Sequence, residues 1–119
     1  VKSQFLKQPL LRETMKKPAA SALLEAGMQR YSGFHFLYKD PHVMKEPSCI
    51  YKLNRITAPI LVVVGDREVT DYRMIAEKIV EKCPNARMRF MSQVGHLPCF
   101  EDIETTKQII LDFLTQAKG

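Results

Sequence analysis

The stretch ITAPILVVVGDREVTD, residues 56–71, decides the fold. Within it PILVVVG, residues 59–65, is an apolar, mostly β-branched run closed by glycine, which is typical of a strand buried on both faces of a parallel sheet. An acidic loop that contains Asp66 and Glu68 follows directly. The stretch therefore predicts an α/β protein in which carboxylates stand at the end of a buried strand.

The residues after this loop continue the alternation of strand and helix. Apolar residues recur at helical spacing and predict one amphipathic helix, at positions 72, 75, 76, 79, 80 and 83. RMRFM, residues 87–91, predicts a second strand, and residues 103–117 predict a last helix with Asp102 as its N-cap. The expected buried face of that helix is Thr106, Ile110, Phe113, Leu114 and Ala117.

This order of elements predicts two parallel strands joined by a right-handed crossover. Parallel sheets need cover on both faces and several neighbouring strands, so two strands by themselves make an incomplete sheet. We therefore expect the rest of the sheet to come from outside the predicted elements.

Residues 1–55 have a different character, helical and irregular. A short helix interrupted at Pro9 is expected first, and a longer helix that starts at Pro18 follows it. Residues 31–55 contain two prolines and a dense group of aromatic residues, which predicts extended or loop structure. The aromatic group either packs in a core or contacts a ligand, and it includes Phe34, Phe36 and Tyr38.

Composition is that of a small globular domain or a piece of a larger one, with 119 residues of which 45% are hydrophobic. No segment of the sequence approaches the roughly 20 apolar residues of a membrane span.

The chain starts with Val1 and with neither a signal nor a transit peptide, so we expect it to be cut from a longer protein. Its three cysteines match no zinc or redox motif, which predicts free thiols and a cytoplasmic protein.

The excess of positive over negative charge lies in the N-terminal half. Residues 1–55 hold ten Lys and Arg against four Asp and Glu, whereas residues 56–119 hold eight against nine. A basic half can bind an acidic partner. The charges are dispersed, however, and no nucleic-acid motif accompanies them. We expect a solvated surface that binds neither nucleic acid nor membrane, with a basic binding module as the alternative.

A histidine follows the second predicted strand, as the acidic loop follows the first. In parallel sheets both loops leave the same edge, where neighbouring strands are about 5 Å apart. A carboxylate there can hold the imidazole in one tautomer and stabilise its protonated form, as a general base requires. The other interpretation of His96, between Gly95 and Leu97, is a hydrogen-bonded surface residue in a tight turn made by the glycine.

ITAPILVVVGDREVTD followed by MSQVGHLPCFEDIETTKQIILDFL resembles the C-terminal third of the α/β-hydrolase fold. In that family a Pro-led strand ends in a Gly-x-x-acid loop, and a Gly-His-x-Pro loop precedes the final helix. The resemblance covers residues 56–119, the C-terminal part of the core. Residues 1–55 more loosely resemble the end of the helical cap that many members insert before this strand.

The resemblance implies a catalytic acid at Glu68 and a catalytic base at His96. Most members have Asp at the acid position, so Asp66 and Asp71 remain alternatives to Glu68. The triad order of serine, then acid, then histidine accommodates either residue type. No cofactor and no metal are implied.

The resemblance also implies parts that this sequence lacks. The nucleophile of the family lies on a G-x-S-x-G elbow upstream of the cap, and no such pattern occurs here. The chain alone should therefore not turn over an ester. In a complete protein the expected small-molecule substrates are carboxylic esters, lactones and some carbon–carbon cleavage products. The alternative is a non-catalytic remnant that pairs with another copy through an exposed sheet edge.

Overall fold

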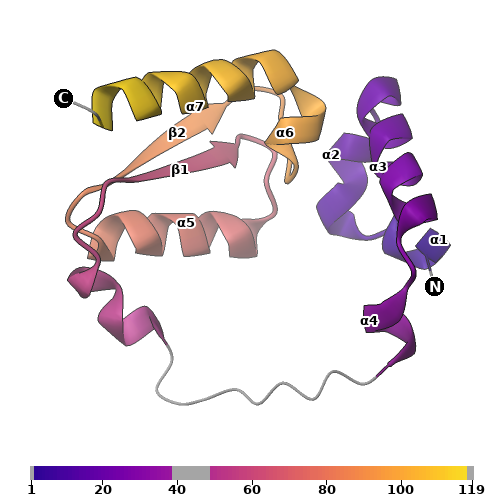
Figure 1. Cartoon of the computed structure of the whole chain (residues 1–119), viewed down its shortest axis with the longest axis horizontal. Helices are drawn as coiled ribbons and strands as arrows, with labels where there is room; N and C mark the ends of the chain where they lie inside the picture. The colour runs from indigo at the N-terminus through magenta and orange to yellow at the C-terminus, as the bar shows by residue number, and fades with distance from the viewer. Residues whose placement is uncertain (1, 39–48, 118–119) are drawn as a thin grey trace.

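Two parallel strands form the centre of the computed structural model, which describes residues 2–38 and 49–117. Strand β1 (Ile60–Gly65) pairs with strand β2 (Ala86–Met91) in a register that runs from Ile60 opposite Ala86 to Gly65 opposite Met91. Because the strands are parallel and end together, the loops that follow them leave the same edge of the sheet (Figure 1). Both predicted strands and their parallel pairing are confirmed.

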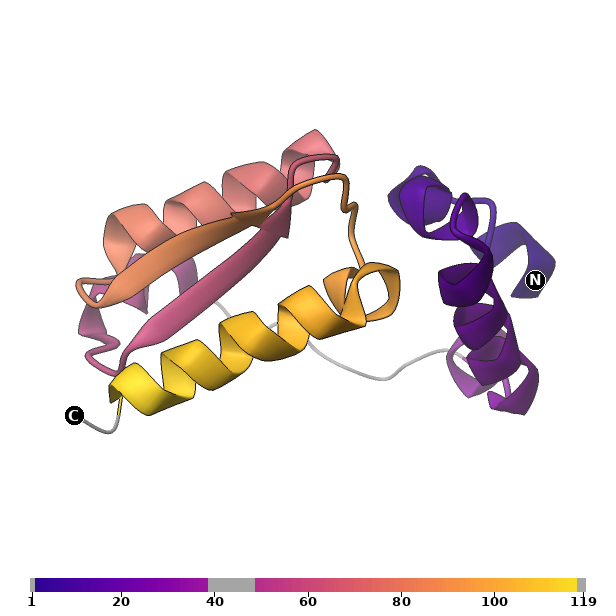
Figure 2. The ribbon, with the colours of Figure 1, turned by 90° about the horizontal axis from the view of Figure 1, so that it is seen from above.

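One long helix lies on each face of this sheet. Helix α5 (Thr70–Lys82) and helix α7 (Ile103–Ala117) flank the strands on opposite sides (Figures 1 and 2). The pleat of β2 sends alternate side chains to the two helices. On the α5 side the guanidinium of Arg73 lies 5.2 Å from the Phe90 ring centre, and on the α7 side that of Arg87 lies 5.3 Å from the Phe113 ring centre. The predicted α/β fold class is confirmed.

The N-terminal residues form a group of helices beyond the carboxyl edge of the strands (Figure 1). They lie beside helix α6 (Pro98–Glu101), and their best-buried side chains are Leu11 and Thr14. The interruption at Pro9 and the helix that starts at Pro18 are as predicted. The elements are α1 (Lys2–Phe5), η1 (Pro9–Leu11), α2 (Arg12–Met15), α3 (Pro18–Arg30) and α4 (Phe34–Leu37).

The expectation of extended or loop structure over residues 31–55 is wrong where the structure describes them. Helix α4 and a 3-10 helix, η2 (Cys49–Arg55), occupy most of the described part. The rings of Phe34 and Tyr38 pack against each other at 5.0 Å but both are exposed, so they do not form a core. The side chain of Phe36, and the two prolines expected to favour a loop, lie outside the described residues.

The predicted buried face of α7 is also partly wrong. Thr106 is buried, but Ile110 and Leu114 are 46% and 50% exposed. The described sheet has two strands, which are too few to cover the whole apolar face of a helix of this length. The predicted N-cap is present, since the Thr105 amide donates a hydrogen bond of 3.1 Å to Oδ1 of Asp102.

All three cysteines are free thiols, with Cys83 buried and Cys49 and Cys99 exposed. Among the described helices, none combines the length and the apolar character needed to cross a bilayer.

Gly65 allows the loops after the two strands to approach each other closely. A Cβ atom at this position would overlap the carbonyl oxygens of Val94 and Gly95. These backbone atoms cannot move aside freely, because the Arg67 amide donates a 2.9 Å hydrogen bond to the Val94 oxygen and ties the two loops together.

We expect Gly65→Ala to lower the free energy of unfolding by about 3 kcal/mol or more, since the overlap can be relieved only by separating the loops. Gly27→Ala, in the middle of α3 with nothing within 4 Å of the new Cβ, is the matched control. It should raise the free energy of unfolding by about 0.5 to 1 kcal/mol through helix propensity. Urea unfolding of both variants measures the difference, and equal effects would contradict the role given to Gly65.

Candidate functional site

Glu68 and His96 meet at the carboxyl edge of the sheet. Glu68 lies in the turn after β1, where its amide donates to the Gly65 carbonyl, and His96 lies in the loop after β2. Nδ1 of His96 is 2.8 Å from Oε2 of Glu68. The two side chains are 22% and 8% exposed, so the contact is largely shielded from water while the imidazole keeps some access to it.

The chemistry of the two groups determines where the proton of a neutral ring lies. A carboxylate can only accept hydrogen bonds, so Nδ1 is the protonated nitrogen and donates to Glu68. The lone pair of the neutral ring is then on Nε2, where the imidazole can accept a proton. A second hydrogen bond, from the Val69 amide to Oε1 of Glu68 at 2.8 Å, holds the carboxylate in place. This arrangement is that of an oriented base.

Tyr72 packs against the imidazole of His96. Its ring, in the first turn of α5, lies with its centre 4.4 Å from that of the His96 ring and is tilted by 57°. An aromatic ring at this distance restricts the orientations that the imidazole can adopt. The sequence suggested no role for Tyr72 other than as part of the apolar face of the helix.

The two alternative acids have other surroundings. Asp66 accepts hydrogen bonds from the Val94 amide at 3.3 Å and the Ser92 hydroxyl at 3.4 Å. A hydrogen bond from the Gln93 amide is the main reason why the pKa of Asp66 lies below its ordinary value. Asp71 is exposed in the first turn of α5. Of the three candidates, Glu68 is the one whose hydrogen bond to His96 is observed.

The loop before His96 is bent at Gln93 rather than at Gly95. Gln93 has a φ of 58°, the one positive φ among the described residues other than glycine. The turn lies at Ser92 and Gln93 and does not include Gly95, which also has no positive φ, so the expectation that Gly95 makes a tight turn is wrong. Glycine is needed at this position for another reason, because a Cβ at Gly95 would lie 2.7 Å from Cβ of Glu13 on α2. The glycine lets the N-terminal helices approach the histidine loop.

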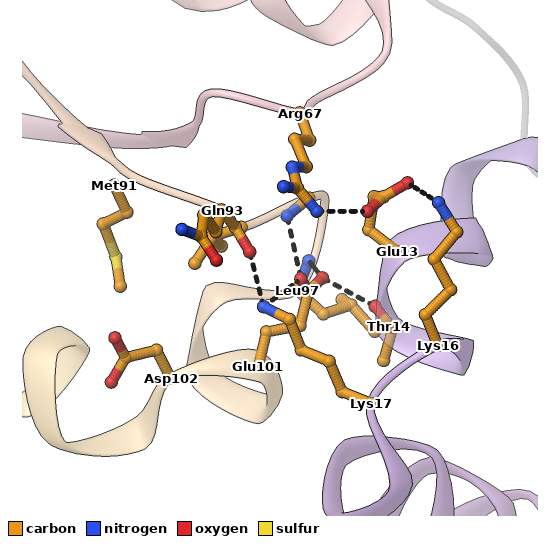
Figure 3. A network of polar contacts seen from close by, with 12 residues as sticks. Glu13, Thr14, Lys16, Lys17, Arg67, Met91, Gln93, Leu97, Glu101 and Asp102 are labelled. Carbon is orange, nitrogen blue, oxygen red and sulfur yellow. Dashed lines mark hydrogen bonds and ion pairs between the residues drawn. The ribbon is translucent and has the colours of Figure 1, made fainter.

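A second carboxylate, Glu101, accepts hydrogen bonds from this loop and from the N-terminal residues (Figure 3). Its Oε2 accepts hydrogen bonds from the Gly95 amide at 2.8 Å and from Nζ of Lys17 at 3.2 Å. Its Oε1 accepts from the Thr14 hydroxyl at 2.7 Å and from the Leu97 amide at 3.2 Å. Burial alone would raise the pKa of Glu101, but these donors outweigh it and bring the pKa below its ordinary value.

The lowered pKa of Glu101 gives stability a definite pH dependence. A carboxyl group whose pKa is lower in the folded chain stabilises the fold above its unfolded pKa, near 4.5, and this contribution is lost as the pH falls through the folded pKa. We therefore expect the difference in unfolding free energy between the wild type and Glu101→Gln to be largest near neutral pH and to shrink below pH 4.5.

Urea unfolding of both proteins across this pH range is the measurement. Asp66, Glu13, Glu81 and Asp102 also have lowered pKa values, and taking the difference between the two proteins removes their shared contribution. Glu104→Gln is the control, because the Glu104 side chain is 81% exposed on α7 and its ion pair with Lys107 should contribute less than about 1 kcal/mol to stability. A difference that stays constant with pH would contradict the prediction.

The same network links the N-terminal helices to the core. Arg67, in the loop after β1, forms an ion pair of 3.2 Å with Glu13, which also pairs with Lys16 at 2.6 Å. Lys17 pairs with Glu101, so part of the basic charge of the N-terminal half is neutralised within the chain. Within residues 2–38 and 49–117, no three His, Cys, Asp or Glu side chains are arranged to hold a metal ion.

Comparison with models of known protein families finds no match, and comparison with curated protein sequences finds none either. Among solved structures, MenH from S. aureus, an α/β-hydrolase-fold protein, matches with a TM-score of 0.77 and 23% sequence identity. The match covers 99% of this chain and 45% of MenH, so the chain spans less than half the length of that protein. The chain has the fold of the C-terminal portion of an α/β-hydrolase.

Proposed function

We propose that this chain is the C-terminal part of a serine-type hydrolase that acts on carboxylic esters, lactones or related carbonyl substrates. The observation that carries the proposal is the 2.8 Å contact between Nδ1 of His96 and Oε2 of Glu68 at the carboxyl edge of the parallel sheet. The chain that holds this contact has the fold of part of an α/β-hydrolase. In open α/β sheets this edge is where ligands and reactive groups gather. An oriented, partly exposed imidazole at this edge is suited to move protons during acyl transfer.

In the proposed mechanism His96 takes the proton from a serine hydroxyl through Nε2 as the oxygen attacks the carbonyl carbon. It then gives the proton to the leaving alkoxide, and a serine ester remains. Water attacks this ester in the same way. Glu68 keeps the proton of the neutral ring on Nδ1 and stabilises the imidazolium in each step.

The serine must come from outside this chain. The 119 residues contain no G-x-S-x-G pattern. Ser92, the serine nearest to His96 in the sequence, hydrogen-bonds to Asp66, one of the acids considered above. The match to less than half of MenH is consistent with a nucleophile elbow on a part of the hydrolase that precedes these residues.

The test starts from the coding sequence in frame upstream of Val1, where we expect a strand, a G-x-S-x-G elbow and a helix. The complete polypeptide should hydrolyse p-nitrophenyl butyrate, and a fluorophosphonate probe should label the serine of that elbow. The 119-residue chain alone should do neither. A reading frame without an elbow, or a complete protein without ester turnover, would contradict the proposal.

Self-association is a second candidate, favoured by apolar surface on both long helices. Large apolar side chains of α5 and α7 are 45% to 61% exposed, and β1 and β2 each have one edge without a partner among the described strands. Unpaired strand edges invite pairing with another chain. These exposed side chains are Tyr72, Met74 and Ile75 on α5, and Ile103, Ile110, Leu111 and Leu114 on α7.

Light scattering across a range of concentrations separates the two candidates. A non-catalytic chain that pairs with its own copies should show a mass that rises with concentration. A chain that stays monomeric at all concentrations would contradict self-association.

A further inference from the structure

The hydrogen bonds of Glu101 bracket His96 in the sequence. The amide of Gly95, the preceding residue, donates to one carboxylate oxygen, and the amide of Leu97, the following residue, donates to the other. Rotation of the backbone at His96 would break at least one of these bonds. The direction in which the imidazole points toward Glu68 therefore depends on the position of the Glu101 carboxylate.

The remaining donors to Glu101 come from the N-terminal helices. Thr14 in α2 and Lys17 between α2 and α3 are 87 and 84 residues away in the sequence. Lys17 also donates a 2.6 Å hydrogen bond to the Gln93 carbonyl, in the bent part of the histidine loop. Figure 3 shows these side chains converging on one carboxylate from the two parts of the chain.

Only an ionised carboxylate satisfies all of these donors. Each oxygen of Glu101 accepts two hydrogen bonds, and the side chain is fully buried, so no water replaces a lost partner. Glutamine at this position would offer one accepting oxygen and turn its NH₂ group toward two donors. A buried donor left without an acceptor is costly, so the loop would move to restore its bonds.

We propose that Glu101 is a positioning residue, which orients His96 toward Glu68. Because Thr14 and Lys17 bind the same carboxylate, this orientation depends on how the N-terminal helices pack against the loop. This proposal rests on the proposed function, because it concerns His96, the base of the proposed mechanism. The hydrogen bonds that support it are observed independently of any activity. A purely structural ion pair with Lys17 would stabilise the chain and leave the imidazole unchanged.

The test is ¹⁵N NMR of the histidine rings in the full chain, comparing the wild type with Glu101→Gln and with Glu104→Gln as the matched control. The ring nitrogen shifts report the tautomer, and the exchange of the Nδ1 proton reports its hydrogen bond. The wild type should carry the proton on Nδ1 of His96. In folded Glu101→Gln both tautomers should be populated and the proton should exchange faster by about tenfold, as expected for loss of one charge-assisted hydrogen bond.

Glu104→Gln should match the wild type in both measurements. A folded Glu101→Gln chain with an unchanged tautomer and unchanged proton exchange would overturn the proposal. If Glu101→Gln does not fold, Thr14→Val decides, because it removes one donor and keeps the shape of the buried side chain. It should shift the His96 signals in the same direction, and unchanged signals would again overturn the proposal.

The NMR measurement also separates this proposal from the proposed function. Altered His96 signals in a protein that hydrolyses no ester would support the positioning role and refute the hydrolase. Ester hydrolysis together with unaltered signals in the Glu101 variant would support the hydrolase and overturn the positioning role.

Discussion

If the chain belongs to the hydrolase proposed above, replacing His96 with alanine should lower kcat of the complete protein by about a millionfold, the loss expected when the histidine of a serine triad is removed. In the proposed mechanism the imidazole takes the serine proton and returns it to the leaving group, and alanine has no group that can do either. Initial rates with a p-nitrophenyl ester measure the loss. What turnover remains would come from substrate binding and stabilisation of the oxyanion.

The same variant must be shown to fold. His96 is partly exposed and its ring packs on Tyr72, so truncation removes one ring contact and one hydrogen bond, and thermal unfolding should remain cooperative. His35→Ala is the matched control, at an exposed histidine of α4, and should retain wild-type turnover. Normal turnover in folded His96→Ala would remove His96 from the mechanism.

Glu68→Gln should lower kcat by about ten-thousandfold, the cost of leaving a triad histidine in the wrong tautomer. Glutamine has nearly the shape of glutamate, but it can turn its NH₂ group toward Nδ1. The ring would then carry its proton on Nε2, where it can no longer accept one from serine. The fold should be unaffected, and kcat from initial rates is the measurement.

Asp66→Asn is the matched comparison for that variant. Asp66 contacts the histidine loop through the backbone and Ser92, and its observed hydrogen bonds do not include the imidazole. Its loss should therefore loosen the loop and reduce turnover far less than the loss of Glu68. If Asp66→Asn abolishes turnover and Glu68→Gln does not, the acid has been assigned to the wrong residue.

The parts of the fold that the sequence predicts correctly are those specified by neighbouring residues. The β-branched run before Gly65 and the helical spacing after it need no distant partner to be recognised. Asp102 caps α7 with a hydrogen bond across three residues. The extent of burial on α7 was predicted less well, because it depends on how many strands the helix covers.

The choice of acid shows where local patterns stop being informative. Asp66, Glu68 and Asp71 lie close together in the sequence, and their spacing alone left all three open. In the structure Asp66 accepts a hydrogen bond from the backbone of the neighbouring loop, and Glu68 accepts one from the ring of His96. The two residues occupy different positions in the turn after Gly65, in which the Gly65 carbonyl accepts a hydrogen bond from the Glu68 amide.

No sequence pattern indicates a role for Glu101, although it stands five residues after the predicted base. A glutamate next to an N-cap, just before a helix, has the appearance of an exposed charge that interacts with the helix dipole. Its buried environment is created by Thr14 and Lys17, which are more than 80 residues away. No periodicity or motif connects such distant positions.

The sequence by itself determined the order of strands and helices and the edge at which an acid and a histidine would meet, because these depend on side-chain periodicity and on parallel pairing. Only the tertiary structure decided which carboxylate faces His96 and which one holds its loop. Those outcomes depend on the direction of individual side chains and on backbone groups brought together from opposite ends of the chain, and both are set by packing.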